Sequence, residues 1–136
     1  MTINVVDTYG QHAGKLWQVL HSMPSLPEQK LLEITKLTTD DFYSAVGWLA
    51  RENKIFKSVN QYSLGETNLT TKIGSHAGRL WRVLDIWGTI DVVSLQRLTR
   101  LEDSDLFAAL GWLAKEGKID ISRTSSQKQS MRVWLK

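Results

Sequence analysis

The sequence contains no cysteine, and this absence removes disulfide bonds, thiolate metal ligands and cysteine nucleophiles together. Its three histidines, His12, His21 and His76, are too few for a histidine-rich metal site. No apolar run approaches the roughly 20 residues of a membrane helix. The first residues also lack the basic start and apolar core of a signal peptide. We therefore expect a soluble, cytoplasmic protein without metal.

Catalytic motifs are missing as well. The chain has no nucleophile elbow, phosphate-binding loop or paired-histidine motif, so we predict neither an enzyme nor a cofactor. Only two prolines occur, against six tryptophans, and 42% of the 136 residues are hydrophobic. This composition is typical of a globular protein with one ordinary domain or two small ones.

The strongest feature is an internal repeat. A shift of 64 residues places GQHAGKLWQVL (10–20) on GSHAGRLWRVL (74–84), and AVGWLARENKI (45–55) on ALGWLAKEGKI (109–119). Between positions 10 and 55, 20 of 46 residues are identical to their partners. Chance identity would be about one in twenty. The chain is therefore a tandem duplication, which we divide into units 1–66 and 67–136 with a linker at about 65–73.

Each unit predicts three helices. In the first unit Ala13, Leu16, Trp17 and Leu20 form a helical stripe that starts near Gly10. The other two helices are expected at Pro27–Lys36, with Leu31 and Ile34 inward, and from Thr39 to about Asn53, with Phe42, Val46 and Leu49 inward. In the second unit the three helices are expected at 77–84, at Val92–Arg100 and from Asp103 to about Gly117. The middle helix has Asp91 as its cap and Leu95 and Leu98 on its inward face.

A pair of short strands around a polar turn follows each third helix, at 54–64 and 118–135. Helix, short strand, helix, turn, helix and β-hairpin is the order of a winged helix-turn-helix domain. The predicted fold class is α+β, mainly α, with two tandem winged helix-turn-helix units, each of three helices and a hairpin wing.

The pattern G-x-x-A-G-x-x-W-x-x-L followed by A-x-G-W-L-A-[RK]-E-x-K-I occurs twice. It is carried by Gly10, Ala13, Gly14, Trp17, Leu20 and 45–55, and again by Gly74, Ala77, Gly78, Trp81, Leu84 and 109–119. This pattern resembles a small bacterial winged-helix family of unknown function. The resemblance implies the fold and nucleic-acid binding, without a defined ligand.

In a helix-turn-helix domain the third helix enters the DNA major groove, and its outward side chains read bases. The outward face here carries Asp40, Ser44, Gly47, Trp48 and Arg51, and in the second unit Ser104, Ala108, Gly111, Trp112 and Lys115. One cation per unit is little, because phosphate contacts dominate DNA affinity. The carboxylates at the start of both third helices would also repel the phosphate backbone of DNA.

The outward Gly-Trp pairs form a candidate interaction surface of Gly47, Trp48, Gly111 and Trp112. A glycine allows another element to approach closely, and a tryptophan is a large anchor. Three interpretations stay open for each tryptophan: packing on its own unit, contact with the other unit or a protein partner, and contact with DNA.

Positive charge is concentrated in the second unit, whose net charge is +4 against −1 for the first. Our candidate DNA-binding residues therefore lie there, and they are Arg97, Arg100, Lys115, Arg123, Lys128 and Arg132. An alternative is a solvated basic surface that keeps the protein soluble.

The leading hypothesis is a transcription-regulator-like protein that binds double-stranded DNA, with both units on one duplex. The alternative is an adaptor that uses tandem winged helices to bind a protein partner and no DNA. The sequence leaves the target, the partner and a choice between monomer and homodimer open.

Overall fold

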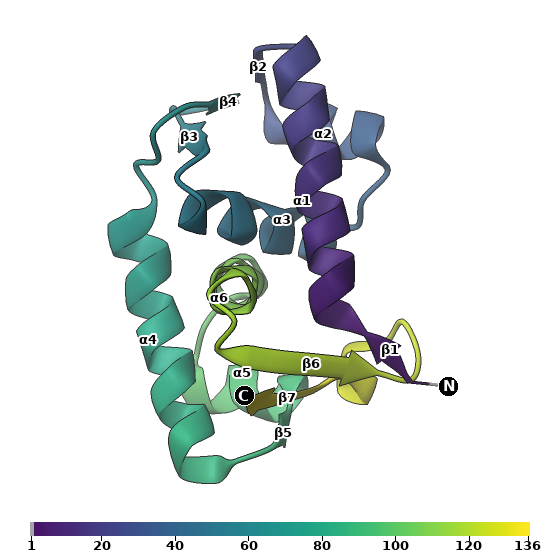
Figure 1. The fold of residues 1–136 in the computed structure, drawn as a ribbon, viewed down its shortest axis with the longest axis vertical. Coiled ribbons are helices and arrows are strands. Elements are labelled where there is room, and N and C mark those ends of the chain that lie inside the picture. The colour runs from purple at the N-terminus through teal and green to yellow at the C-terminus, as the bar shows by residue number, and fades with distance from the viewer. Residues whose placement is uncertain (1) are drawn as a thin grey trace.

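The computed structural model describes residues 2–136, which form two successive sets of three helices and a β-hairpin (Figure 1). The first set comprises β1 (Ile3–Asn4), α1 (Val5–Ser22), β2 (Ser25–Leu26), α2 (Glu28–Thr35), α3 (Thr39–Arg51), β3 (Ile55–Lys57) and β4 (Tyr62–Leu64). The second comprises α4 (Thr70–Trp87), β5 (Ile90–Asp91), α5 (Val92–Thr99), α6 (Asp103–Lys115), β6 (Ile119–Arg123), the 3₁₀ turn η1 (Lys128–Ser130) and β7 (Arg132–Leu135). Helices α5 and α6 repeat α2 and α3 at a spacing of 64 residues.

Helix α1 begins earlier than the sequence indicates. The prediction of a start near Gly10 is wrong, because Asn4 caps the helix and its side-chain oxygen accepts a hydrogen bond from the Val6 amide at 3.0 Å. Gly10 therefore lies inside α1. The predicted stripe is buried at Ala13, Leu16 and Leu20.

The turn before each third helix uses a left-handed residue, Lys36 with φ 61° and Arg100 with φ 59°. Helices α3 and α6 then begin at Thr39 and Asp103, as predicted. Thr38 caps α3 by accepting from the Asp41 amide, and Glu102 precedes α6 without a side-chain cap.

The prediction that Leu98 points inward is wrong, since 44% of its surface is exposed. The inward face of the short helix α5 runs through Val92, Leu95 and Thr99 instead. At 100° per residue these three positions lie on one side of the helix, and Leu98 lies on its flank.

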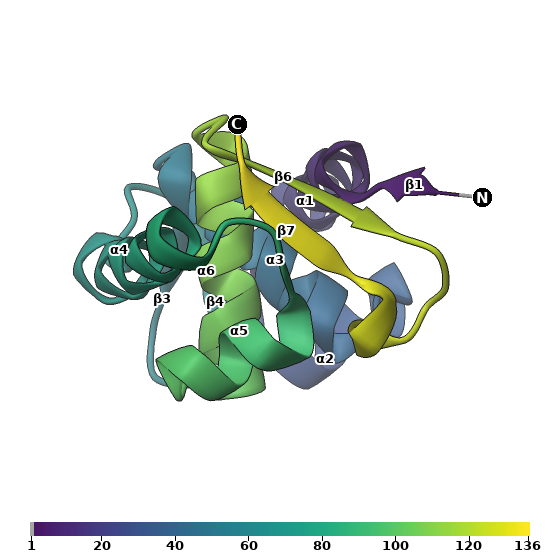
Figure 2. The same ribbon diagram turned by 90° about the horizontal axis from the view of Figure 1, so that it is seen from below.

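Two small antiparallel sheets complete the units, with strand orders β2-β4-β3 and β1-β6-β7-β5. The second sheet takes its outer strand from the start of the chain, where Ile3 lies opposite Arg123 and Asn4 opposite Ser122. Figure 2 shows β1 beside β6 at this edge. The limits 1–66 and 67–136 stay a prediction, and β1 of the first range completes the sheet of the second.

Each set of helices surrounds its own core, and the two cores exchange a few side chains. Val5 and Tyr9 of α1 are buried in the second core, whereas Ile73 of α4 and Ala108 of α6 are buried in the first. Trp17 packs against the first core, and Trp81 is 39% exposed. The chain thus forms two units with a shared boundary rather than one fused core.

The boundary is a crossing of the two third helices. In Figure 1, α6 is seen end-on next to α3, which runs across the page. A Cβ atom on Gly47 would lie 1.9 Å from the Ala108 carbonyl oxygen, and one on Gly111 would lie 2.0 Å from that of Ser44. Only glycine permits this contact, because each Cα faces the backbone of the opposite helix.

We predict that Gly47→Ala and Gly111→Ala each destabilise the fold by more than the roughly 1–3 kcal/mol of ordinary overpacking, since the obstructing atoms belong to the backbone. Gly14→Ala and Gly78→Ala are the matched controls. They also replace mid-helix glycines, but their Cβ atoms would meet nothing within 4 Å. The controls should stabilise the protein by up to about 1 kcal/mol. Urea unfolding curves of the four variants measure both effects, and equal behaviour of the two pairs would contradict the proposed role of the crossing.

Candidate interaction site

The outward faces of the third helices, where DNA contact was considered, are buried against each other. Ser44, Gly47, Ala108 and Gly111 are all buried at the crossing. The Ser44 hydroxyl donates to the Asp40 carbonyl of its own helix at 3.0 Å, so it brings no unpaired polar group into the contact. Bases cannot reach these faces while α3 and α6 are packed together.

Trp48 and Trp112 lie at the margins of the crossing, and each contacts both units. Trp48 packs on α1, where its ring lies 3.1 Å from the position of a Cβ on Gly10, and the Lys115 ammonium of α6 lies 5.6 Å from its ring centre. Trp112 makes the equivalent contacts with Gly74 and with Arg51, whose guanidinium lies 5.7 Å from the ring. Each of the two tryptophans therefore packs on its own unit and contacts the other unit as well.

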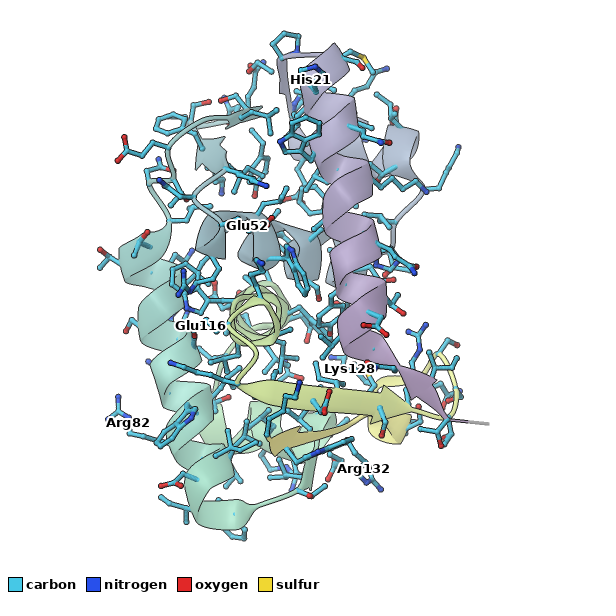
Figure 3. All side chains as sticks on the ribbon, viewed as in Figure 1. His21, Glu52, Arg82, Glu116, Lys128 and Arg132 are labelled. Atoms are coloured by element: carbon cyan, nitrogen blue, oxygen red, sulfur yellow. The ribbon has the colours of Figure 1, made fainter. Side chains whose placement is uncertain are left out.

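Ion pairs join the units around these tryptophans. Arg51 lies 3.1 Å from Glu116, and Lys115 lies 3.7 Å from Glu52. Within its own unit Glu52 also pairs with Lys54, and Glu116 with Lys118, both at 3.5 Å. Figure 3 shows Glu52 next to α3 and Glu116 next to α6. Each carboxylate thus faces two cations, which leaves one positive charge in excess on each side.

Lys115, Lys128 and Arg123, three of the predicted DNA-binding residues, face carboxylates of this chain. Lys115 belongs to the inter-unit ion pair, and Lys128 of the wing lies 2.7 Å from Asp103. Hydrogen bonds from Lys128 and Gln96 hold the pKa of Asp103 below its usual value. Arg123 lines a cleft of about 310 Å³ together with Lys128, Asp40 and Asp41.

The other three are placed differently. Arg97 and Arg100 are exposed on α5 and at its end, and Arg132 is exposed on β7, where it donates to the Gln129 carbonyl at 3.1 Å. No carboxylate of residues 2–136 lies within 4.0 Å of these three guanidinium groups. Of the six residues, Lys115 and Lys128 thus have a carboxylate partner, Arg123 lies near two acids in the cleft, and Arg132 lies opposite Asp91 of β5.

Two matching clefts lie between the first and third helix of each unit. The first, of about 410 Å³, is lined by Gly10, Ala13, Gly14, Trp17, Gln18, Trp48, Leu49, Glu52 and Lys54. The second, of about 450 Å³, is lined by Gly74, Ala77, Gly78, Trp81, Arg82, Trp112, Leu113, Glu116 and Lys118. The two linings correspond at every position at the 64-residue shift. We call them the twin clefts.

Sequence reasoning missed the twin clefts, although it used their residues. Ala13 and Trp17 were assigned to a core stripe, and Trp48 to an outward face. The available signal was identity between the repeats: eight of the nine lining positions carry the same residue in both units, and Gln18 is replaced by Arg82. Helical periodicity alone does not reveal the lining residues, because they come from two helices and from the chain after the third helix.

His12 marks the other side of α1. Its Nδ1 lies 3.9 Å from an Asp41 oxygen at the start of α3, and His76 stands equally far from Asp105. Burial lowers the pKa of His12, and the neighbouring Asp41 charge offsets part of that effect. The imidazole is therefore held neutral at neutral pH.

We predict that His12 contributes to acid destabilisation. Because its pKa is lower in the folded protein, the unfolded chain binds the proton more tightly, and the free energy of unfolding falls as the pH drops below about 6.5. Urea unfolding between about pH 7.5 and about pH 5.5 should show a smaller loss of stability in His12→Gln than in the wild type. His76→Gln controls for removal of an imidazole at the matching position. An unchanged pH dependence in His12→Gln would contradict this role.

Within residues 2–136, no helix combines the length and apolar character needed to cross a membrane. The same part of the chain has no group of three His, Asp or Glu side chains placed to hold a metal ion.

Two successive sets of helix, short strand, helix, helix and hairpin define a tandem winged helix-turn-helix protein. The chain matches the winged helix-turn-helix domain family (DUF2582) twice, over 4–64 and 68–131. It belongs to this family, which confirms the predicted fold class and the resemblance seen in the signature residues.

No curated protein matches the chain. Among solved structures it is similar to the solution NMR structure of protein BT2368 from Bacteroides thetaiotaomicron. That likeness has 26% identity and a TM-score of 0.41, and it covers 48% of this chain and 77% of the other. A score of this size supports no functional conclusion.

Proposed function

We propose that this chain is a protein-interaction adaptor whose third helices join its two units instead of reading DNA. The mutual burial of α3 and α6 carries the proposal, because major-groove readout needs at least one third helix with a free outward face. Opening the crossing would expose two glycines, two half-buried tryptophans and the inter-unit ion pairs to water.

Charge supports the same conclusion. Asp40 and Asp103 lie close together at the start of α3 and α6, and burial together with the Asp103 charge raises the pKa of Asp40. Lys128 compensates these acids instead of facing solvent alone. A DNA phosphate placed here would meet carboxylates first, and that repulsion opposes binding.

Exposed apolar side chains favour a protein partner. Ile86 is 78% and Trp87 62% exposed at the end of α4, and Leu98 is 44% exposed on α5. Large apolar side chains at a surface are common at protein interfaces, where aromatic residues are enriched.

The adaptor proposal predicts that a closed crossing is the working state. In the variant Arg51→Cys/Glu116→Cys, whose native side chains meet at 3.1 Å, a short bismaleimide should join the units site-specifically, since the chain has no other cysteine. We expect no binding to random duplex DNA at low salt, with or without the cross-link. The same variant capped with a monofunctional maleimide is the control. Salt-sensitive DNA binding that the cross-link abolishes would show that the third helices open onto DNA, and would refute the adaptor.

Duplex DNA remains a second candidate because of the three solvent-facing arginines of the second unit. In the described chain Arg97, Arg100 and Arg132 have no carboxylate within 4.0 Å, although Arg132 lies opposite Asp91, so their guanidinium groups can contact phosphates without base readout. The ligand would then be duplex DNA, as in the regulator predicted from the sequence, but the third helices would not contact it.

For this candidate we predict that Arg97→Glu/Arg100→Glu/Arg132→Glu weakens duplex binding equally for all sequences and lowers the salt slope by about one per lost contact. Lys30→Glu/Lys36→Glu, on the matching helix of the first unit and at its end, is the control. Binding measured by fluorescence anisotropy over a salt series distinguishes the two. Unchanged affinity of the triple variant would remove the arginines from consideration.

A further inference from the structure

We propose that the twin clefts are two equivalent binding sites for short acidic peptide segments that carry an apolar side chain. The inference rests on the proposed adaptor function and names the surface and the kind of partner. It draws on the identity of the linings, on one unexplained glycine in each unit and on the charge around the clefts.

The identity of the linings is unusual for a surface. The two units differ at most exposed positions, yet eight of nine lining positions are identical. Within 10–55 and 74–119, all of which the structure describes, the positions exposed in both units carry different residues except at Lys54 and Lys118. Both of these lysines line a cleft. Buried positions repeat because the cores repeat. The two lysines pair with Glu52 and Glu116, and because each glutamate also faces a cation of the other unit, both repeats keep a positive charge in excess beside the cleft.

Gly14 and Gly78 provide the second observation. Gly10 is explained by the tryptophan that packs on it, and Gly47 by the helix crossing, but a Cβ on Gly14 or Gly78 would meet nothing within 4 Å. Glycine is unfavourable in the middle of a helix. Both units nevertheless keep it at a position that opens into the cleft. A bare stretch of helix surface allows a ligand to approach the backbone of α1 or α4 closely.

The chemistry of the walls defines the ligand. Trp17 and Trp48 provide indole surfaces in the first cleft, which suit an apolar side chain of the ligand. Around Glu52 the two cations Lys54 and Lys115 outnumber the carboxylate. The matching Glu116 faces Lys118 and Arg51, and Arg82 adds a further cation to the second cleft.

This charge favours a peptide over a nucleic-acid strand. With Lys115 and Arg51 counted, one cation is in excess beside the first cleft and two beside the second, where Arg82 is added, which matches one or two ligand carboxylates. A nucleic-acid strand would instead bring one phosphate charge per nucleotide along a surface that contains Glu52 and Glu116. The clefts also adjoin each other, since Arg51 and Lys115 link them across the crossing. A partner with two acidic segments would therefore bind both, with a gain from effective concentration.

The test uses the pentapeptide acetyl-Gly-Glu-Phe-Glu-Gly-amide, with two carboxylates, as probe and the indole N–H signals of the protein in NMR spectra as readout. We expect two equivalents to bind and the signals of Trp17, Trp48, Trp81 and Trp112 to shift. Gly14→Gln should leave one site, and Gly14→Gln/Gly78→Gln should weaken binding by about tenfold or more. Helix propensity favours glutamine over glycine, so circular dichroism should show an intact fold. Gln11→Ala/Ser75→Ala, at matching exposed positions of the same helices and outside the clefts, is the matched control and should bind like the wild type.

Peptides with lysine in place of the acids, or glycine in place of phenylalanine, should not bind. Equal binding by the double glycine variant, or equal binding of the lysine peptide, would overturn the proposal. Oligothymidylate that binds where the acidic peptide does not, and loses affinity in the double glycine variant, would assign the clefts to nucleic acid and also overturn it. If neither ligand binds at millimolar concentration, the twin clefts are not a site of this kind. That result leaves the adaptor proposal standing, because the cross-linking experiment tests it separately.

Discussion

The architecture depends on one contact, in which Gly47 and Gly111 each bring a helix against the backbone of the other. No side chain separates the helices at this point, so even one methyl group is excluded on steric grounds. The contact fixes the units relative to each other and determines which surfaces remain free. It uses the part of each winged helix that would otherwise face a DNA groove. A fold often associated with DNA is therefore arranged here around an internal interface.

The residues around the crossing serve the contact between the two units. Trp48 and Trp112 cover its margins, and each receives a cation from the opposite unit. The charges that reach across, Arg51 and Lys115, also set the positive excess beside the clefts. Exposed ion pairs contribute only about 0–1 kcal/mol each, so their main effect here is on the electrostatics of the surface. The residues that pair across the crossing thus also determine the charge beside the clefts.

Local patterns predicted much of the fold and little of the site. The helices at 28–35 and 39–51 follow from helical periodicity and from Asn53 and Gly117, which adopt left-handed backbone angles just after α3 and α6. The repeat follows from sequence identity and the hairpins from the two apolar segments around each polar turn. The predicted start of α1 at Gly10 is wrong because the capping residue, Asn4, lies before the apolar stripe on which the prediction rests. The outward Gly-Trp pairs were identified as a surface, but a sequence cannot distinguish a surface that meets another molecule from one that meets its own duplicate. The twin clefts need residues from two helices, and pairing these requires the tertiary structure.

The short strand at the start of the chain has a consequence for how the protein is made. Ile3 and Asn4 pair with Arg123 and Ser122, and Val5 and Tyr9 are buried among residues of the last helix and hairpin. Strand β1 is synthesised well before β6, so it reaches its final place only after β6 has been made. Contacts so distant in sequence slow folding, because the closure entropy of the intervening chain opposes them. Most of the first core is made of residues that are synthesised early, whereas the second sheet combines strands from both ends of the described chain.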